Sequence, residues 1–308
     1  MEKAIPIGKE PKNEPDISSI VPINRVTFAD KIRSYLKKPF SFMIMLLVML
    51  AALITVGSVA WVILHTFISG IPNLKPELFE WEYTPENLSM MPAIINTLFI
   101  ATVSLAIAVP IGVFAAIFMV EYAKSTNFLV KIVRMAAETL AGIPSIVYGI
   151  FGMLCFVYFF GWGESVLSGS LTMALMILPL VMRTTEEALK AVPDTFREGS
   201  YALGAGKLRT IFVIILPSAM SGIISGVILG LGRVVGETAA LIFTAGSYSF
   251  VAGGFMEGGR TLAVHVYILA SNGLYEDQAW AAAVVLILLV VVINGLAEFV
   301  GNKLKKEY

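Results

Sequence analysis

The stretch EGSYALGAGKLRTIFVIILP, residues 198–217, passes from a charged, glycine-rich connection into a long apolar run. The connection covers about residues 183–210, and the apolar run begins near Ile211 and continues past Pro217. A bilayer core needs about 20 apolar residues per helical span, so this junction is typical of a loop that enters a transmembrane helix. It predicts a membrane protein.

The composition of the whole chain supports this prediction. Hydrophobic residues make up 57% of the 308 residues and charged residues only 14%, whereas soluble domains carry roughly a quarter charged residues. The charges are concentrated in residues 1–40, which hold 13 of the 44 formal charges and five of the 14 prolines. This composition argues against a soluble enzyme or binding domain, and we expect a polar tail followed by helices in the membrane.

Apolar runs that alternate with polar connections predict an all-α protein with six transmembrane helices. The first helix, residues 41–68, follows the tail 1–40 and precedes an external loop at 69–91. A core at 92–300 holds the other five helices, and 301–308 form a C-terminal stub. We expect the spans at about 41–67, 92–120, 139–160, 170–182, from 211 onward, and 280–300, with a short extra helix near 261–271.

The distribution of Lys and Arg predicts the orientation of these helices. The tail 1–40, the connections 121–138 and 183–210, and the C-terminal stub together hold 19 of the 22 basic residues. Cytoplasmic loops of membrane proteins carry an excess of Lys and Arg. We therefore expect a multi-pass protein of the plasma (inner) membrane with both termini in the cytoplasm.

Read as a pattern, residues 198–217 give E-G-S-x3-G-x9-I-x-L-P, which resembles the E-A-A-x3-G-x9-I-x-L-P signature of ABC importer permeases. Every spacing is kept, and Gly199 and Ser200 replace the two alanines. Both replacements are small, so we expect the contact surface to survive with a slightly weaker helix. The resemblance implies the type I importer permease fold and contact with an ATPase through Glu198, Gly199, Ser200, Gly204, Leu216 and Pro217.

The physical expectation for this loop is a short helix that projects into the cytoplasm and fits a groove of the partner. Gly204 would allow a sharp turn after it, and a rigid corner at Leu216-Pro217 would pass the partner's movement into the helix bundle. The pair Gly206-Lys207 does not belong to a phosphate-gripping loop, because G-x-x-x-x-G-K-[ST] is not completed here. We expect a transport subunit without enzymatic activity or cofactor of its own, with ATP and Mg bound by the separate ATPase.

Small and charged residues share one face of the fifth span. Gly222, Gly226 and Gly230 recur every four residues, a spacing that lets helix backbones approach closely in lipid. Arg233 and Glu237 continue along roughly the same face. A charge within a span is costly unless it is paired or hydrated, so both are candidates for a functional role.

Two segments resemble PstA-type permease subunits of phosphate ABC importers. Residues 232–240, GRVVGETAA, are similar to the R-x-x-G-E-T motif of that family, and so is the run MRTTEEALKAVP at 182–193. The likeness covers about 90–300. It implies inorganic phosphate as the substrate, and a role on the translocation path for Arg233, Glu237 and Arg183. The implied partners are a PstC-type permease subunit, a PstB-type ATPase dimer and a periplasmic or extracellular phosphate-binding protein. A sulfate or molybdate permease, or the PstC-type subunit itself, is the alternative.

The chemistry of the two charges offers two interpretations. A guanidinium binds phosphate oxygens as a fork. A carboxylate can accept a hydrogen bond from an oxyanion only where that anion has a protonated oxygen, which phosphate has near neutral pH and sulfate lacks. Glu237 would then help to reject sulfate; alternatively, it forms an i,i+4 pair that neutralises Arg233. Arg183 lies at the cytoplasmic end of the fourth span, a position that is more typical of an interfacial anchor than of a ligand. Pro144 in AGIPS, residues 141–145, predicts a break in the third span. No metal-ligand spacing is present.

Overall fold

The structure, a computed structural model, describes residues 39–123 and 128–305, and no strand occurs among them. Nearly all of the predicted tail 1–40, and the last three residues of the stub, lie outside the described residues. The chain divides into two units, residues 1–63 and 64–308. The α-helices are α2 (Pro39–Gly70), α3 (Met91–Ile117), α4 (Phe128–Ala141), α5 (Ser145–Gly152), α6 (Val166–Ala191), α7 (Asp194–Ala202), α8 (Lys207–Thr210), α9 (Leu216–Val235), α10 (Ala239–Thr244), α11 (Leu262–Ser271) and α12 (Glu276–Lys305). Short π-helical segments are η4 (Phe118–Tyr122), η5 (Met153–Phe159) and η6 (Ile211–Ile215), and 3-10 turns are η2 (Ile71–Asn73) and η3 (Pro76–Phe79).

Six membrane spans are accounted for, as predicted. Five helices in the described residues are long and apolar enough to cross a bilayer: Phe40–Asn73, Met91–Tyr122, Val166–Ala191, Lys207–Val235 and Glu276–Gly301. The broken pair of α4 followed by α5 and η5, which is bent by 104°, is apolar and long enough when taken together and makes the sixth span when it is counted as one. The all-α, six-span fold class is confirmed.

The break between α4 and α5 lies where the AGIPS segment predicts it. α4 ends at Ala141, and α5 begins at Ser145 with Pro144 as its N-cap. Proline has no N–H to donate and disfavours a helical conformation in the residue before it. The predicted third span, 139–160, is wrong at its start, however, because α4 already begins at Phe128 and takes up part of the presumed loop 121–138.

The fourth span is longer than predicted. The expected helix, 170–182, is in fact α6, which runs from Val166 to Ala191. Arg183 therefore lies inside this helix and does not follow it. The charged residues after 182 suggested a loop, but two pairs of them are spaced four apart and form ion pairs along the helix, Arg183 with Glu187 and Glu186 with Lys190. Such pairs support a helix that crosses out of the apolar layer.

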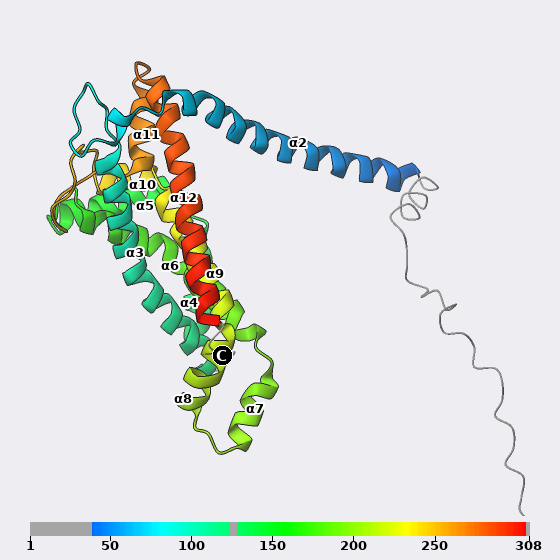
Figure 1. Ribbon diagram of the computed structural model, residues 1–308. Helices are drawn as coiled ribbons and strands as arrows, with labels where there is room; N and C mark the ends of the chain where they lie inside the picture. Colours follow the sequence, from blue (N-terminus) through cyan, green and yellow to red (C-terminus); the bar gives the residue numbers. More distant parts are fainter. Residues whose placement is uncertain (1–38, 124–127, 306–308) are drawn as a thin grey trace, which may run out of the picture. The chain divides into compact units, whose positions relative to one another are not determined.

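Within the unit 64–308, different helices and loops lie at the two ends of the helix bundle (Figure 1). α7 and α8 lie at one end together with the end of α12, whereas α11 and the loop at 71–90 lie at the opposite end. α6 is the most buried of the candidate spans in the described residues, and α3 and α9 pack against it. α6 therefore forms the central helix, with Met173, Met176 and Ile177 fully buried in the core.

The predicted short helix near 261–271 is confirmed as α11 (Leu262–Ser271). Two polar side chains of α3 hold the glycine-rich segment before it. Asn96 donates to the carbonyl oxygens of Phe250 and Arg260, at 2.9 and 3.3 Å, and Thr97 Oγ1 accepts from the N–H of Leu262 at 2.8 Å. These bonds satisfy buried backbone groups that would otherwise be costly, so the segment is fixed to α3.

The glycines of the fifth span bring α9 close to α6, as predicted. A Cβ atom added at Gly222 would lie 2.5 Å from the Cβ of Ala188, and one added at Gly226 would overlap the side chain of Thr184. At Gly230 the nearest atom would be 3.7 Å away, an ordinary contact. Only glycine therefore permits the α6–α9 approach at positions 222 and 226.

Candidate functional site

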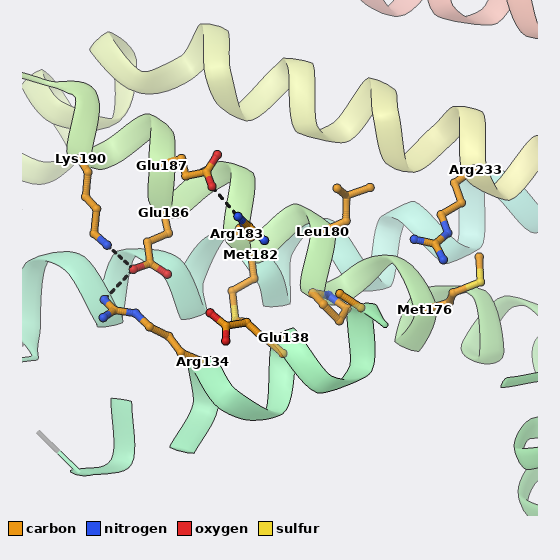
Figure 2. Close-up of a pocket in the computed structure, with 13 residues that line it drawn as sticks. Arg134, Glu138, Met176, Leu180, Met182, Arg183, Glu186, Glu187, Lys190 and Arg233 are labelled. Carbon is orange, nitrogen blue, oxygen red and sulfur yellow. Dashed lines mark hydrogen bonds and ion pairs between the residues drawn. The ribbon is translucent and has the colours of Figure 1, made fainter. Parts of the chain in front are cut away.

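A pocket of about 350 Å³ lies between α4, α6 and α9. Residues 134–141 of α4 form one wall, residues 176–190 of α6 form a second, and Arg233 from the last turn of α9 closes the third side. In Figure 2, Arg134, Glu186 and Lys190 lie at one end of the pocket and Arg233 at the other. The lining residues are Arg134, Ala137, Glu138, Ala141, Met176, Pro179, Leu180, Met182, Arg183, Glu186, Glu187, Lys190 and Arg233.

Most charges of this pocket are paired. Glu186, which is only 7% exposed, accepts from Arg134 on α4 and from Lys190 one turn along α6, both at 2.6 Å. Arg183 pairs with Glu187 at 3.0 Å, and this pair is largely exposed. The Glu186 pairs stabilise the packing of α4 against α6, because a buried carboxylate without a cation would carry a large desolvation cost.

Arg233 differs from the other three cations of the pocket. No carboxylate in the described residues forms an ion pair with it, whereas Arg134, Arg183 and Lys190 each have one. Its side chain points into the pocket near Met176 and Leu180 (Figure 2). A guanidinium in such a place offers a forked set of N–H donors to a tetrahedral oxyanion. The arrangement is therefore suited to bind an anion transiently.

Glu237 does not share this pocket. α9 ends at Val235 with Gly236 as its C-cap, so Glu237 lies beyond the helix that carries Arg233. Its Oε1 accepts from the backbone N–H of Ala240 at 3.1 Å, in the first turn of α10. A carboxylate at a helix N-terminus satisfies a free N–H and favours the helix dipole. The i,i+4 pair considered from the sequence is absent among the described residues, because the helix ends between its two members.

The segment that resembles the importer-permease signature forms the predicted helix with the predicted turn after it. Glu198 and Gly199 are exposed on α7, whereas Ser200 is buried and its hydroxyl lies 2.8 Å from the Thr210 hydroxyl of α8. Gly204 follows with φ +81°, a left-handed conformation that side chains other than glycine rarely adopt. The replacement of the second alanine by serine therefore adds a hydrogen bond between α7 and α8.

The predicted corner at Leu216-Pro217 is wrong. α9 begins at Leu216, but it continues the π-helical η6, and the whole run Lys207–Val235 forms one candidate span. Pro217 lies in the first turn of α9, where a missing N–H does no harm because the first N–H groups of an α-helix have no α-helical partner. α7 thus connects to α9 through the turn at Gly204 and then through a continuous helical segment, with no corner at Leu216-Pro217.

Several residues of the site carried no recognised signal in the sequence. Arg134 and Glu186 lie 52 positions apart, and their pairing depends on the 104° bend that folds α4 against α6. Glu186 and Lys190 have a visible i,i+4 spacing, but they lie in a charged stretch that predicts a loop. In the described residues no group of three His, Cys, Asp or Glu side chains is arranged to hold a metal ion.

Comparison with known proteins gives the family. The family described as binding-protein-dependent transport system inner membrane component matches residues 108–306. The phosphate transport system permease protein PstA of Haemophilus influenzae is 32% identical over 272 residues, which are 85% of this chain and 94% of that protein. The probable ABC transporter permease protein YqgI of Bacillus subtilis is 36% identical over 228 residues, which are 69% of this chain and 77% of that protein.

Solved structures share the fold at low sequence identity. One chain of a bacterial alginate ABC transporter, in complex with an alginate pentasaccharide-bound periplasmic protein, superposes with a TM-score of 0.64 at 14% identity. The match covers 89% of this chain and 99% of that chain. The chain therefore belongs to the family of binding-protein-dependent transport system inner membrane components, and within it to the PstA-type permeases.

Proposed function

We propose that this chain is a membrane-spanning subunit of an ATP-driven importer that carries inorganic phosphate into the cytoplasm. The names of its relatives support the substrate, since PstA proteins 31–38% identical to it are called phosphate transport system permeases. The observation that carries the proposal is Arg233, a guanidinium that has no ion-pair partner in the described residues and faces a pocket between α4, α6 and α9. The pocket places a forked donor where a passing oxyanion would need one.

The pocket favours transit over tight binding. It holds four cationic side chains and three carboxylates in the described part of the chain. Three of the cations are engaged in ion pairs: Arg134 and Lys190 share Glu186, and Arg183 pairs with Glu187. An anion therefore meets one guanidinium without an ion pair, Arg233, together with weaker contacts to Arg183. A path that alternately opens to each side must release its substrate. One cation without an ion pair attracts the anion but does not bind it so tightly that release becomes slow. Arg183 is then an assisting residue and not a mere anchor.

The partners follow from the same proposal. α7, with Glu198 and Gly199 exposed, is the surface for a PstB-type ATPase dimer, which binds ATP and Mg. A PstC-type subunit completes the path, and a phosphate-binding protein delivers substrate at the opposite end. Both termini are cytoplasmic in this scheme, and the end of α12 lies at the same end of the bundle as α7 (Figure 1). The chain itself performs no covalent chemistry.

This function is tested by ATP hydrolysis of the complete complex in lipid nanodiscs. We expect phosphate-loaded binding protein to stimulate hydrolysis several-fold over the ligand-free protein, since a coupled importer hydrolyses ATP productively when substrate is delivered. A complex whose hydrolysis responds to sulfate- or molybdate-loaded binding proteins, but not to the phosphate-loaded one, would contradict the proposed substrate.

Glu237 provides a separate prediction about selectivity. Glutamine at this position keeps a side-chain oxygen for the Ala240 N–H but gains an N–H₂ donor, so it can bind a fully deprotonated oxyanion. We expect Glu237→Gln to import phosphate while excess sulfate begins to compete. Glu237→Ala, which also loses the bond to α10, serves as the comparison for a purely structural effect. Continued exclusion of sulfate by Glu237→Gln would restrict Glu237 to capping α10.

A further inference from the structure

Arg197, in the middle of α7, connects three separate helical elements. Its Nε and Nη2 donate to Oε1 of Glu121 at 3.1 and 2.8 Å, and Glu121 lies in η4 at the end of α3. The same guanidinium donates to the carbonyl oxygens of Leu189 and Val192, at 3.0 and 2.9 Å, where α6 ends. One side chain thus joins α7 to the ends of α3 and α6.

The burial of these partners distinguishes the strong bonds from the weak one. Side chains of Arg197 and Glu121 are 15% and 5% exposed, whereas Asp194, which Arg197 also contacts at 3.1 Å, is 86% exposed. Exposed ion pairs contribute little, but removal of one member of a buried pair leaves an uncompensated charge and is strongly destabilising. The connection therefore depends on Glu121 and the α6 carbonyl oxygens.

The electrostatic state of Arg197 agrees with this geometry. Burial lowers the pKa of Arg197, but its hydrogen bond and charge interaction with Glu121, together with Asp194, outweigh burial, so the pKa lies above its ordinary value.

Arg197 also differs from a simple cap of α6. A cap needs only the carbonyl oxygens of that helix, whereas the bond to Glu121 reaches a helix 76 positions away in the sequence.

The C-terminal part of α7 is held as well, through Ser200. The buried hydroxyls of Ser200 and Thr210 lie 2.8 Å apart and tie α7 to α8, which leads directly into α9. α7 is therefore fixed to three helices that pack together, α3, α6 and α9. Two of these, α6 and α9, line the pocket that contains Arg183 and Arg233.

We propose that Arg197 is the positioning residue that passes displacement of α7 to α3 and α6, and thereby couples ATP hydrolysis to movement of the pocket walls. This inference rests on the proposed importer function, because it assumes that an ATPase docks on α7. Without the Arg197 bonds, α7 stays linked to α9 through Ser200 and Thr210 and to α6 only through the two-residue connection Val192-Pro193. The bond to Glu121 at the end of α3 is lost, and the end of α6 is no longer held to α7 by a side chain. The ATPase then still docks on α7, but displacement of α7 is passed less effectively to α3 and α6.

The test compares three variants of the complete complex in proteoliposomes: Arg197→Ala, Glu121→Gln and, as the matched control, Asp194→Asn. We expect the first two to keep the ATPase subunit during purification but to import about two- to thirtyfold less phosphate per ATP hydrolysed, the range over which single mutations change the coupling between sites. Asp194→Asn removes the exposed partner of the same arginine and is expected to match the unaltered complex. Hydrogen–deuterium exchange of residues 118–123 should rise in Arg197→Ala and not in Asp194→Asn.

Other outcomes of this experiment would contradict the role proposed for Arg197. An unchanged ratio of phosphate to ATP in Arg197→Ala, or an equal loss in Asp194→Asn, would overturn the inference. Loss of the ATPase subunit from the Arg197→Ala complex would also overturn it and make Arg197 a docking contact. If the unaltered complex imported no phosphate, the proposed function would fail, and the exchange at 118–123 alone would decide: a rise supports the connection, and no change refutes it.

Discussion

Replacement of Arg233 by alanine is expected to lower ATP-dependent phosphate uptake by about ten- to a hundredfold, the equivalent of losing charge-assisted hydrogen bonds worth roughly 1.5–3 kcal/mol. The reason is that Arg233 is the one cation lining the pocket in the described residues that has no carboxylate partner. The measurement is the initial rate of radiolabelled phosphate uptake by proteoliposomes, with complex assembly checked by co-purification of all subunits.

Two control variants separate local binding from general electrostatics. Lys131→Ala removes a positive charge from an exposed position of α4 that does not line the pocket, and it should leave uptake unchanged. Arg233→Lys keeps the charge but loses the fork, so it should give an intermediate rate. A rate for Arg233→Ala equal to that of Lys131→Ala would remove Arg233 from the translocation path.

Replacement of Gly226 by alanine is expected to destabilise the subunit by about 1–3 kcal/mol, the usual cost of overpacking a tight helix contact. A Cβ at this position would lie 2.7 Å from the Cβ of Thr184, so a change of the threonine rotamer does not relieve the overlap. The backbones of α6 and α9 must move apart. We expect a lower thermal midpoint of the purified complex and less assembled complex in the membrane.

Gly230→Ala is the matched control for this prediction. It makes the same substitution one turn further along α9, where the added Cβ would meet its nearest neighbour at 3.7 Å. Its thermal midpoint should equal that of the unaltered complex. Equal destabilisation by the two variants would show that the close α6–α9 contact at Gly226 is not the cause, because alanine favours a helix more than glycine does and should not by itself destabilise α9.

The fold was largely predictable because its strongest signals are local. Long apolar runs identify the spans, Pro144 marks the break before α5, and Gly204 marks the turn after α7. The length of α6 was not predictable in the same way, since hydropathy ends at about residue 182 while the helix continues to Ala191. Its last turns are stabilised by ion pairs, among them one with Arg134 that exists only after α4 has folded back.

The candidate site was predictable only in part. A charge inside an apolar run identified Arg233, but the partners that decide its role come from other helices. Helical spacing predicts that Glu237 lies next to Arg233, yet α9 ends between them, at Val235 with Gly236 as its C-cap, and Glu237 caps α10. Arg197 lay next to the recognised motif, but its connection to Glu121 spans 76 positions and depends on how α3, α6 and α7 meet. Local patterns do not encode such contacts.

The central claim is tested most directly by radiolabelled phosphate uptake into proteoliposomes that hold the whole complex, with binding protein outside, ATP inside, and excess sulfate or molybdate as competitors. We predict uptake that requires ATP and is unaffected by either competitor. Absence of ATP-dependent uptake, or equal suppression by sulfate, would contradict the assignment of this chain to phosphate import.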